Sequence, residues 1–265
     1  MKDYGLVSII TPAYNSASFI SETIESIMAQ TYPNWELLVT DDLSTDRTRE
    51  VVEEYARKDN RIHYFRLAEN MGPGAARNNS IEAAKGRFIA FCDSDDRWVP
   101  TKLEEQLKFM TDNGYHFTYT SYKECSPNGT INGYVECPVK IKRFNIIQDD
   151  CIGCLTAIYD TQKTGKCYMP LTRRRQDWCL WIDIISRFGP AYGLRKPLSI
   201  YRLRDQSVSS NKLKLIKYNF NVYNKYLGYN KLKAGFILSA LFLPHYFYKK
   251  IRRKIEFQLK KKLYV

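Results

Sequence analysis

Residues 86–96 read GRFIAFCDSDD, and this stretch decides the fold. Its apolar part, residues 88–92 (FIAFC), contains no charged side chain, and the chain turns strongly polar directly after it, at Asp93. A continuous apolar run of this length is typical of a strand that is buried on both faces, as the strands of parallel sheets are. We therefore expect a buried strand whose carboxyl end presents a group of carboxylates.

The same pattern occurs twice upstream, where residues 6–11 (LVSIIT) end at Pro12 and residues 36–40 (ELLVT) end at Asp41 and Asp42. Segments with helical spacing of apolar residues lie between and after these runs. We expect helices at about residues 18–28, 46–58, 75–84 and 101–110, and further strands at residues 62–65 and 117–122. Strands that alternate with helices predict an α/β fold, with a mostly parallel sheet and helices on both of its faces.

Polar residues at the ends of three predicted strands are the first functional signal. Pro12 and Tyr14 follow the first strand, Asp42 follows the second, and Asp93 and Asp95 follow the fourth. Open parallel sheets bind their ligands at the carboxyl ends of the strands. These five residues are therefore expected to face one binding site.

Regular alternation fades after residue 122. Turn residues are frequent between residues 123 and 170, so we expect irregular structure there, with a short strand or two near residues 154–159. Apolar spacing predicts a helix again at residues 177–188, and a strand is expected at residues 197–203.

Charge is distributed very unevenly along the chain. Of its 265 residues, 44% are hydrophobic and 26% are charged, which excludes a disordered or collagen-like protein. The formal net charge is +13, yet residues 212–265 hold 14 of the 41 Lys and Arg residues and a single acidic residue, Glu256. Residues 1–211 therefore contain 27 residues of each sign. A neutral body argues against a nucleic-acid partner, because a basic face is the signature of that function.

The seven cysteines are expected to be reduced thiols of a cytoplasmic protein. Cys151 and Cys154 form one C-x-x-C, and with Cys137 and Cys167 they could supply four zinc ligands. No second C-x-x-C and no nearby histidine accompany them, so we favour free thiols. The N-terminus reads as a strand rather than a signal peptide, and no run of 18 apolar residues predicts a transmembrane helix.

The first strand–helix turn is the place where a nucleotide-binding motif is expected. That turn reads TPAYN (residues 11–15) and lacks the glycines of a dinucleotide-binding G-x-G-x-x-G, and the chain contains no P-loop. Asp93 and Asp95 could instead hold Mg²⁺ or Mn²⁺ against phosphate oxygens. A D-x-D occurs roughly once by chance in a chain of this composition, so a solvated acidic turn is the plain alternative.

Other side chains also have two interpretations. Asp42 either shapes a turn or accepts a hydrogen bond from a base or ribose, and Tyr14 either packs or stacks on a base. Asp177 either caps the helix that follows it or acts as a general base toward a hydroxyl acceptor. Arg175, the last of three consecutive arginines, either binds a phosphate group or is solvated.

Together these motifs give the chain a family resemblance that covers about residues 5–210. They occur in the order VSIITPAYN, WELLVTDDLSTD, NMGPGAARN, GRFIAFCDSDDRW, QDWCLW and YRLRDQSVS. In this order and spacing they resemble glycosyltransferase family 2, in particular members that build bacterial surface polysaccharides. The resemblance implies the GT-A fold and an inverting transfer of sugar from a nucleoside diphosphate donor, with a divalent cation, Mn²⁺ or Mg²⁺, as cofactor.

The resemblance also assigns roles to individual residues. It implies that Asp177 is the catalytic base and that Asp95 is the metal ligand. The implied nucleotide-binding residues are Pro12, Tyr14, Asp42, Arg77, Asp93, Ser94 and Asp95. Weaker candidates for contacts with the diphosphate or the acceptor are Arg204, Arg175 and Trp181.

Two positions depart from the family pattern. Gln176 stands where the family usually has Glu, next to the catalytic Asp. Arg204 stands where many members have His. Arginine cannot bind a metal but can hold phosphate oxygens, so Arg204 is expected to take over part of the charge neutralisation, which leaves the degree of metal dependence open.

The resemblance divides the chain into a nucleotide-binding part at about residues 1–122, an acceptor-binding part at about residues 123–211, and a C-terminal tail at residues 212–265. The tail contains an apolar stretch, residues 234–248, between basic segments. This apolar stretch is too short to span a bilayer but suits the surface of an anionic membrane. We expect a cytoplasmic enzyme, peripherally bound to the inner face of the cell membrane, where a lipid-diphosphate-linked glycan acceptor would be found. The alternative is a helical cap that packs Phe236, Ile237, Leu241 and Phe242 on the domain.

Two other functions compete with a UDP-sugar-dependent transferase. A sugar nucleotidyltransferase would need a Gly-rich phosphate loop after the first strand, and TPAYN is not one. A non-catalytic membrane-binding module would explain the tail but would leave Asp42, Asp95 and Asp177 without a role.

Overall fold

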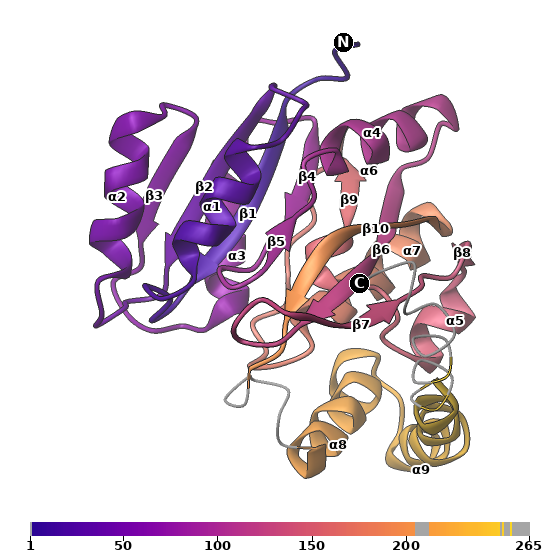
Figure 1. The fold of residues 1–265 in the computed structure, drawn as a ribbon. Coiled ribbons are helices and arrows are strands. Elements are labelled where there is room, and N and C mark those ends of the chain that lie inside the picture. The colour runs from indigo at the N-terminus through magenta and orange to yellow at the C-terminus, as the bar shows by residue number, and fades with distance from the viewer. Residues whose placement is uncertain (1, 205–211, 250, 252–254, 256–265) are drawn as a thin grey trace.

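A ten-stranded sheet organises the residues that the computed structural model describes, which are 2–204, 212–249, 251 and 255 (Figure 1). Its first part is parallel, in the order β3-β2-β1-β4. These strands are β1 (Val7–Ala13), β2 (Trp35–Asp41), β3 (Ile62–Arg66) and β4 (Phe88–Phe91). Both β1 and β2 are buried along their whole length, which explains why apolar residues predominate in them without alternating with exposed polar ones.

The second part of the sheet is mixed. The strand β9 (Ile158–Asp160) runs antiparallel to β4 on one side and to β6 (Phe117–Cys125) on the other. β6 pairs in parallel with the long strand β10 (Ala191–Arg202). Three short strands complete the sheet: β5 (Arg97–Trp98), β7 (Ile131–Val135) and β8 (Lys140–Ile141).

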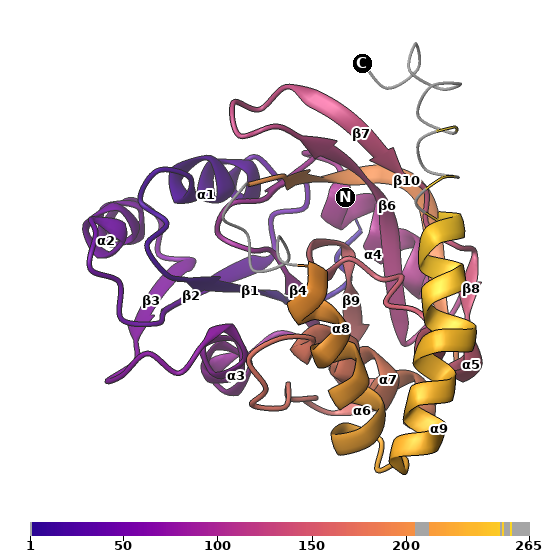
Figure 2. The same ribbon diagram turned by 90° about the horizontal axis from the view of Figure 1, so that it is seen from below.

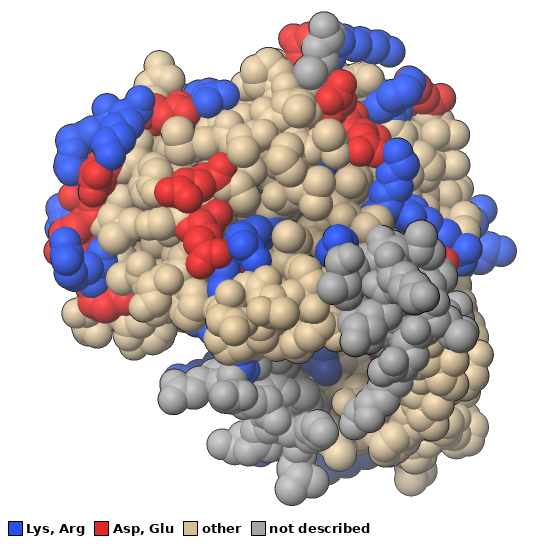
Figure 3. All heavy atoms as spheres, viewed as in Figure 1, with Lys and Arg blue, Asp and Glu red and all other residues tan. Residues whose placement is uncertain are grey.

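Helices cover both faces of the sheet, as predicted (Figure 2). In the parallel part, α1 (Ile20–Met28) and α2 (Thr48–Lys58) lie on one face and α3 (Pro73–Ala83) lies on the other. The remaining helices before residue 204 are α4 (Lys102–Asp112), α5 (Arg143–Gln148), α6 (Thr161–Thr164) and α7 (Gln176–Phe188). One hydrophobic core lies under α1, α2 and α4, and a second core surrounds α7. Figure 3 shows basic and acidic side chains interspersed around α2, in line with the balanced charge of the body.

The C-terminal helices pack against the same core as α7. They are α8 (Lys212–Asn221), a π-helical stretch (Val222–Tyr226), α9 (Lys231–Phe236) and a second π-helical stretch (Ile237–Phe242) that continues as a helix to residue 249. The second π stretch ends two residues before Pro244, whose ring and missing N–H disturb the preceding helical turn. None of the described helices is long and apolar enough to cross a bilayer.

Burial shows which tail residues pack on the domain. Ile237 and Phe242 are buried in the core around α7, and Leu241 packs against it. Phe236, in contrast, is 64% exposed. The expectation of a helical cap is therefore confirmed for Ile237, Leu241 and Phe242 and is wrong for Phe236. The last segment of the tail, residues 256–265, lies outside the described residues.

The expectation of irregular structure between residues 123 and 170 is wrong in part. A hairpin joins β6 to β7, β8 pairs with β10, and α5 follows. The strand β7 was not predicted because its sequence, INGYV, contains Asn and Gly, which have low strand propensity. The predicted strand at residues 197–203 begins earlier, at Ala191, and passes Pro197 through a register irregularity. The short strand expected near residues 154–159 is confirmed by β9.

Candidate active site

Asp42 lies directly after β2 and holds the beginning of α3. Its Oδ1 accepts a hydrogen bond from the backbone N of Met71 at 2.7 Å, and its Oδ2 accepts one from the backbone N of Gly72 at 2.8 Å. Gly72 has a φ of +88°, a conformation that favours glycine. Burial raises the pKa of Asp42, and the two backbone hydrogen bonds oppose this rise. The turn after β2 and the start of α3 therefore form one unit.

Arg77 extends this unit to the D-x-D loop. This α3 residue is buried and donates a hydrogen bond from Nη2 to Asp93 Oδ1 at 2.5 Å. Burial disfavours the charge of Arg77, but the nearby charges, those of Asp93 and Asp177 among them, outweigh burial and raise its pKa. The guanidinium therefore lies within electrostatic range of both carboxylates, which are far apart in the sequence.

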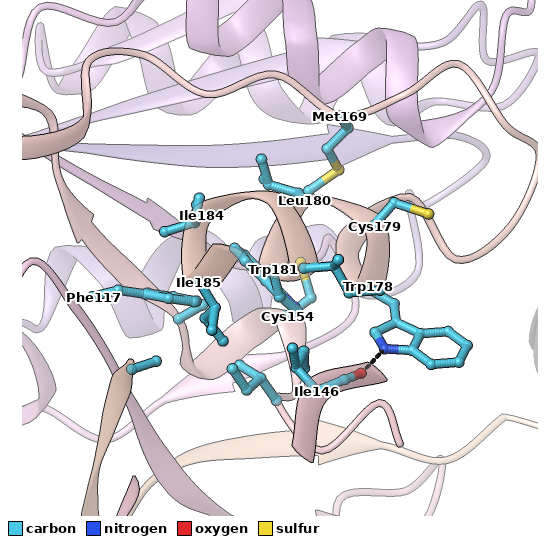
Figure 4. Packing of buried hydrophobic residues seen from close by; sticks show 14 of the residues in the cluster. Phe117, Ile146, Cys154, Met169, Trp178, Cys179, Leu180, Trp181, Ile184 and Ile185 are labelled. Carbon is cyan, nitrogen blue, oxygen red and sulfur yellow. Dashed lines mark hydrogen bonds between the residues drawn. The ribbon is translucent and has the colours of Figure 1, made fainter. Parts of the chain in front are cut away.

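Asp177 is placed by the packing of α7. It is the second residue of that helix, and the next residue, Trp178, is buried and donates from Nε1 to the backbone O of Ile146 at 2.6 Å (Figure 4). The residue before it, Gln176, packs so closely on α3 that a Cβ on Gly74 would lie 3.1 Å from its Cγ. The amino ends of α7 and α3 thus meet, and they bring the predicted base to the predicted nucleotide site.

The D-x-D loop concentrates negative charge. Burial and the charge of Asp93 raise the pKa of Asp95, while Arg204 opposes this rise with its Nε 2.7 Å from Asp95 Oδ2. Asp96 is buried, accepts a hydrogen bond from the backbone N of Arg202 at 3.0 Å and has a pKa well above its usual range, mainly because of burial. Its Oδ2 has no hydrogen-bond partner among the described residues. Such a loop favours added positive charge.

The remaining predicted nucleotide-binding residues lie at the same edge of the sheet. Ser94 Oγ is 2.8 Å from Ser16 Oγ, and this hydrogen bond joins the D-x-D loop to the first strand–helix turn. Pro12 is buried within β1, opposite Thr40 of β2. Tyr14 is 51% exposed, so its ring is free to stack on a base.

Two of the weaker candidates, Arg175 just before α7 and Trp181 within it, have structural partners. Arg175 has a φ of +67° and donates hydrogen bonds to Asp150 Oδ2 at 3.0 Å and to Asn219 Oδ1 at 2.8 Å. It therefore joins α7 to a preceding loop and to α8. The prediction that Trp181 contacts diphosphate or acceptor is wrong, because its side chain is fully buried against Phe91 and Phe117.

Asp150 is a site residue that the sequence analysis missed. Burial raises its pKa to about 7, the charge of Asp177 adds to this rise, and Arg175 opposes it. A second carboxylate thus lies within electrostatic range of the predicted base. No motif marks Asp150, since it belongs to the irregular segment before β9. The motif residues Asp205 to Ser209 lie outside the described residues.

The family model described as "Glycosyl transferase family 2" matches residues 8–165. The chain belongs to this family. It is 40% identical over 230 residues to the "Putative teichuronic acid biosynthesis glycosyltransferase TuaG" of Bacillus subtilis (strain 168), covering 86% of this chain and 91% of that protein. A second relative is the "UDP-Glc:alpha-D-GlcNAc-diphosphoundecaprenol beta-1,3-glucosyltransferase WfgD" of Escherichia coli, 39% identical over 242 residues, 91% of this chain and 94% of that one.

Solved structures confirm the fold of this family 2 member. S. aureus TarS 1–349 in complex with UDP-GlcNAc superposes with a TM-score of 0.67 at 24% identity, covering 96% of this chain and 75% of that chain. The mannosyltransferase PcManGT from Pyrobaculum calidifontis, in complex with GDP-Man and Mn²⁺, gives 0.65 at 18% identity, covering 88% and 69%. The expected GT-A fold is thereby confirmed. The family match and the two relatives support the expected hexosyltransferase and set aside the nucleotidyltransferase and the non-catalytic module.

Proposed function

We propose that this glycosyltransferase moves a hexose from a UDP-sugar to a hydroxyl of a lipid-diphosphate-linked glycan, with inversion, during the synthesis of a bacterial surface polysaccharide. The observation that carries the proposal is the meeting of Asp42, Asp93 and Asp177 around the beginning of α3. The printed activities of WfgD and of WfaP from Escherichia coli, which is 36% identical over 237 residues, support the choice of donor and acceptor.

The donor nucleotide is expected at the carboxyl ends of β1, β2 and β4. Tyr14 would stack on the base, and Asp42 would accept its N–H. Both oxygens of Asp42 already accept backbone hydrogen bonds, but each carboxylate oxygen has a second lone pair. Asp93 would lie nearer the ribose and Asp95 nearer the diphosphate.

A divalent cation, Mn²⁺ or Mg²⁺, fits the chemistry of the D-x-D loop. No group of three or more His, Cys, Asp and Glu side chains within the described residues is arranged to hold a metal on its own. Asp95, with Asp93 beside it, would therefore bind the ion together with diphosphate oxygens. When bound, the ion supplies positive charge to the departing diphosphate. Arg204, already next to Asp95, would share this role.

Asp177 would perform the proton transfer. As the acceptor hydroxyl forms its bond to C1 of the sugar, the bond from C1 to the UDP oxygen breaks, and Asp177 takes the hydroxyl proton. One base on the face opposite the leaving group gives a single displacement, hence a β product from an α-linked donor. Arg77 and Arg204 would hold the surrounding negative charge.

Replacement of the base tests this function. Asp177→Asn is expected to lower kcat by about a hundredfold or more while UDP affinity stays close to that of the wild type. The assay follows sugar transfer from radiolabelled UDP-, GDP- and TDP-sugars to a short lipid-diphosphate GlcNAc acceptor, with and without Mn²⁺. Asp112→Asn, an exposed change on α4, is the matched control. Near wild-type turnover of Asp177→Asn would refute the assigned base.

The tail supports the proposed membrane location. Six large apolar side chains on the C-terminal helices are 56–87% exposed: Leu232, Phe236, Phe247, Tyr248, Ile251 and Ile255. The tail also holds 14 Lys and Arg residues. Each basic residue near an anionic bilayer contributes about 1 kcal/mol of attraction. We therefore place the enzyme peripherally on the inner face of the cell membrane.

A further inference from the structure

A pocket of about 480 Å³ lies between the segment that joins β7 to β8 and the C-terminal helix. Val139 and Lys140 belong to the first wall, and Tyr248 and Lys249 belong to the second. Cys151 and the β10 residue Arg195 also line the pocket. Figure 2 shows the C-terminal helix beside β8 and α5, on the side of the molecule where the pocket lies. The proposed donor site does not use these residues.

One wall of the pocket contains a residue that neighbours the proposed catalytic centre. Cys151, in the lining, directly follows Asp150, whose carboxylate is within electrostatic range of Asp177 and bonded to Arg175. The other wall includes Tyr248, which is 62% exposed and belongs to the proposed membrane-binding surface. The pocket is therefore lined both by a neighbour of Asp150 and by part of that surface.

The lining combines cations with apolar surface. Lys140, Arg195 and Lys249 supply basic side chains to the lining, and His245 adds an imidazole. The opposing carboxylates are Glu136, whose Oε1 lies 3.3 Å from Nη1 of Arg195, and Asp149, which is bonded to Lys249. Val139 and Tyr248 are 57% and 62% exposed and add apolar surface at the mouth.

We propose that this pocket binds the diphosphate and the first isoprenoid units of the acceptor's lipid carrier. The cations would pair with the phosphates, the apolar mouth would cover the start of the lipid chain, and the sugar beyond the diphosphate would extend past Asp150 toward Asp177. This inference rests on the proposed function, since it names the place where that acceptor is held. A nucleotide donor fits this pocket less well, because the base-stacking and D-x-D residues lie elsewhere.

The test measures binding by calorimetry, with farnesyl diphosphate as the probe. The full chain is saturated with UDP first, so that the donor diphosphate site is filled. The double variant Val139→Asp, Lys140→Glu places negative charge at two exposed positions of the lining, where folding should survive. Lys85→Glu, an equally exposed charge reversal in the turn before β4, is the control, and thermal unfolding verifies that each variant is folded.

Farnesyl diphosphate is expected to bind the wild type and Lys85→Glu equally, and the double variant at least about tenfold more weakly. Farnesol and inorganic diphosphate, which each supply half of the ligand, should bind more weakly than farnesyl diphosphate. Unchanged binding to the double variant, or no binding to the wild type, would overturn the proposal. Binding without transfer from any donor would leave the pocket in place and refute the proposed function instead.

A kinetic experiment checks the same site during turnover. The double variant is expected to raise KM for a polyprenyl-diphosphate acceptor. This rise should exceed, by a factor of at least about ten, the rise in KM for the same sugar on a short soluble aglycone. An equal rise for both acceptors would show a general disturbance of the acceptor site and would contradict a lipid-carrier pocket.

Discussion

Arg204 replaces a histidine that many family members carry, and its Nε lies 2.7 Å from Asp95. A guanidinium cannot bind metal, so it neutralises the D-x-D loop by its own charge. Arg204→Ala is expected to lower kcat/KM for the donor by about tenfold or more, because it removes the positive charge of the ion pair with Asp95. Arg204→His should recover the activity that Arg204→Ala loses only when Mn²⁺ is added. It should reach its half-maximal rate at a lower Mn²⁺ concentration than the wild type. Equal Mn²⁺ titrations of wild type and Arg204→His would contradict this role.

Lys102 allows a test of how the stability of the fold depends on pH. It is fully buried in α4, donates to Gln106 Oε1 at 2.5 Å, and burial lowers its pKa from 10.5 to about 7. Between these values the unfolded chain binds more protons than the folded one, so this group makes stability rise as pH increases from about 7 to 10.5. Lys102→Met should remove this contribution. Urea unfolding at pH 7 and pH 9.5 measures it, and identical pH slopes in wild type and variant would refute it.

The site was predictable where a residue follows a strand or opens a helix. Asp42, Asp93 and Asp95 were found in this way, and the family resemblance gave Asp177 its role. Asp150 was not found, because its place beside Asp177 results from contacts between segments far apart in the chain. The assignment of Trp181 as a ligand contact is wrong, because Trp181 lies in the buried apolar core with Leu180 and Ile184, as the apolar spacing of α7 favours.

Among the elements, α7 is held in place by distant parts of the chain. Arg175, just before the helix, donates to Asn219 of α8 at 2.8 Å, and Asn219 is 2% exposed. Asn219→Leu removes this acceptor and is expected to lower the unfolding free energy by about 1.5–3 kcal/mol. It should also lower kcat with little change in KM for the donor, because the base is displaced. Asn219→Asp keeps the acceptor and should restore kcat; if both variants behave alike, this positioning role is wrong.

Strands that are buried on both faces, and helices with apolar residues at regular spacing, were predicted correctly. The parallel strands β1, β2 and β4 are buried on both faces, and α1 and α7 each have one apolar face, so their sequences carry a strong signal. β7 and β8 are short and gain their hydrogen bonds from β6 and β10. Their local sequence therefore held too little information to predict them.

At the scale of the whole molecule, the basic tail both completes the core and exposes apolar side chains. Removing residues 212–265 would uncover the core around α7, so point substitutions test membrane binding more cleanly. Changing Leu232, Phe236, Ile251 and Ile255 to Ser is expected to abolish flotation with vesicles rich in anionic lipid. Wild type should float less with neutral vesicles and at high salt. Equal flotation of wild type and variant would end the proposal of a membrane-binding tail.

The packing of the C-terminal helices on α7 has a consequence for biosynthesis. A ribosome delivers the strands and α7 well before the helices that complete the core around them. The nascent protein therefore cannot secure α7, which carries the proposed catalytic base, until residues 212–249 have emerged. Under the proposed function, that part also carries the membrane-binding surface, so the enzyme would gain its working centre and its means of reaching the lipid-bound acceptor in the same step of synthesis.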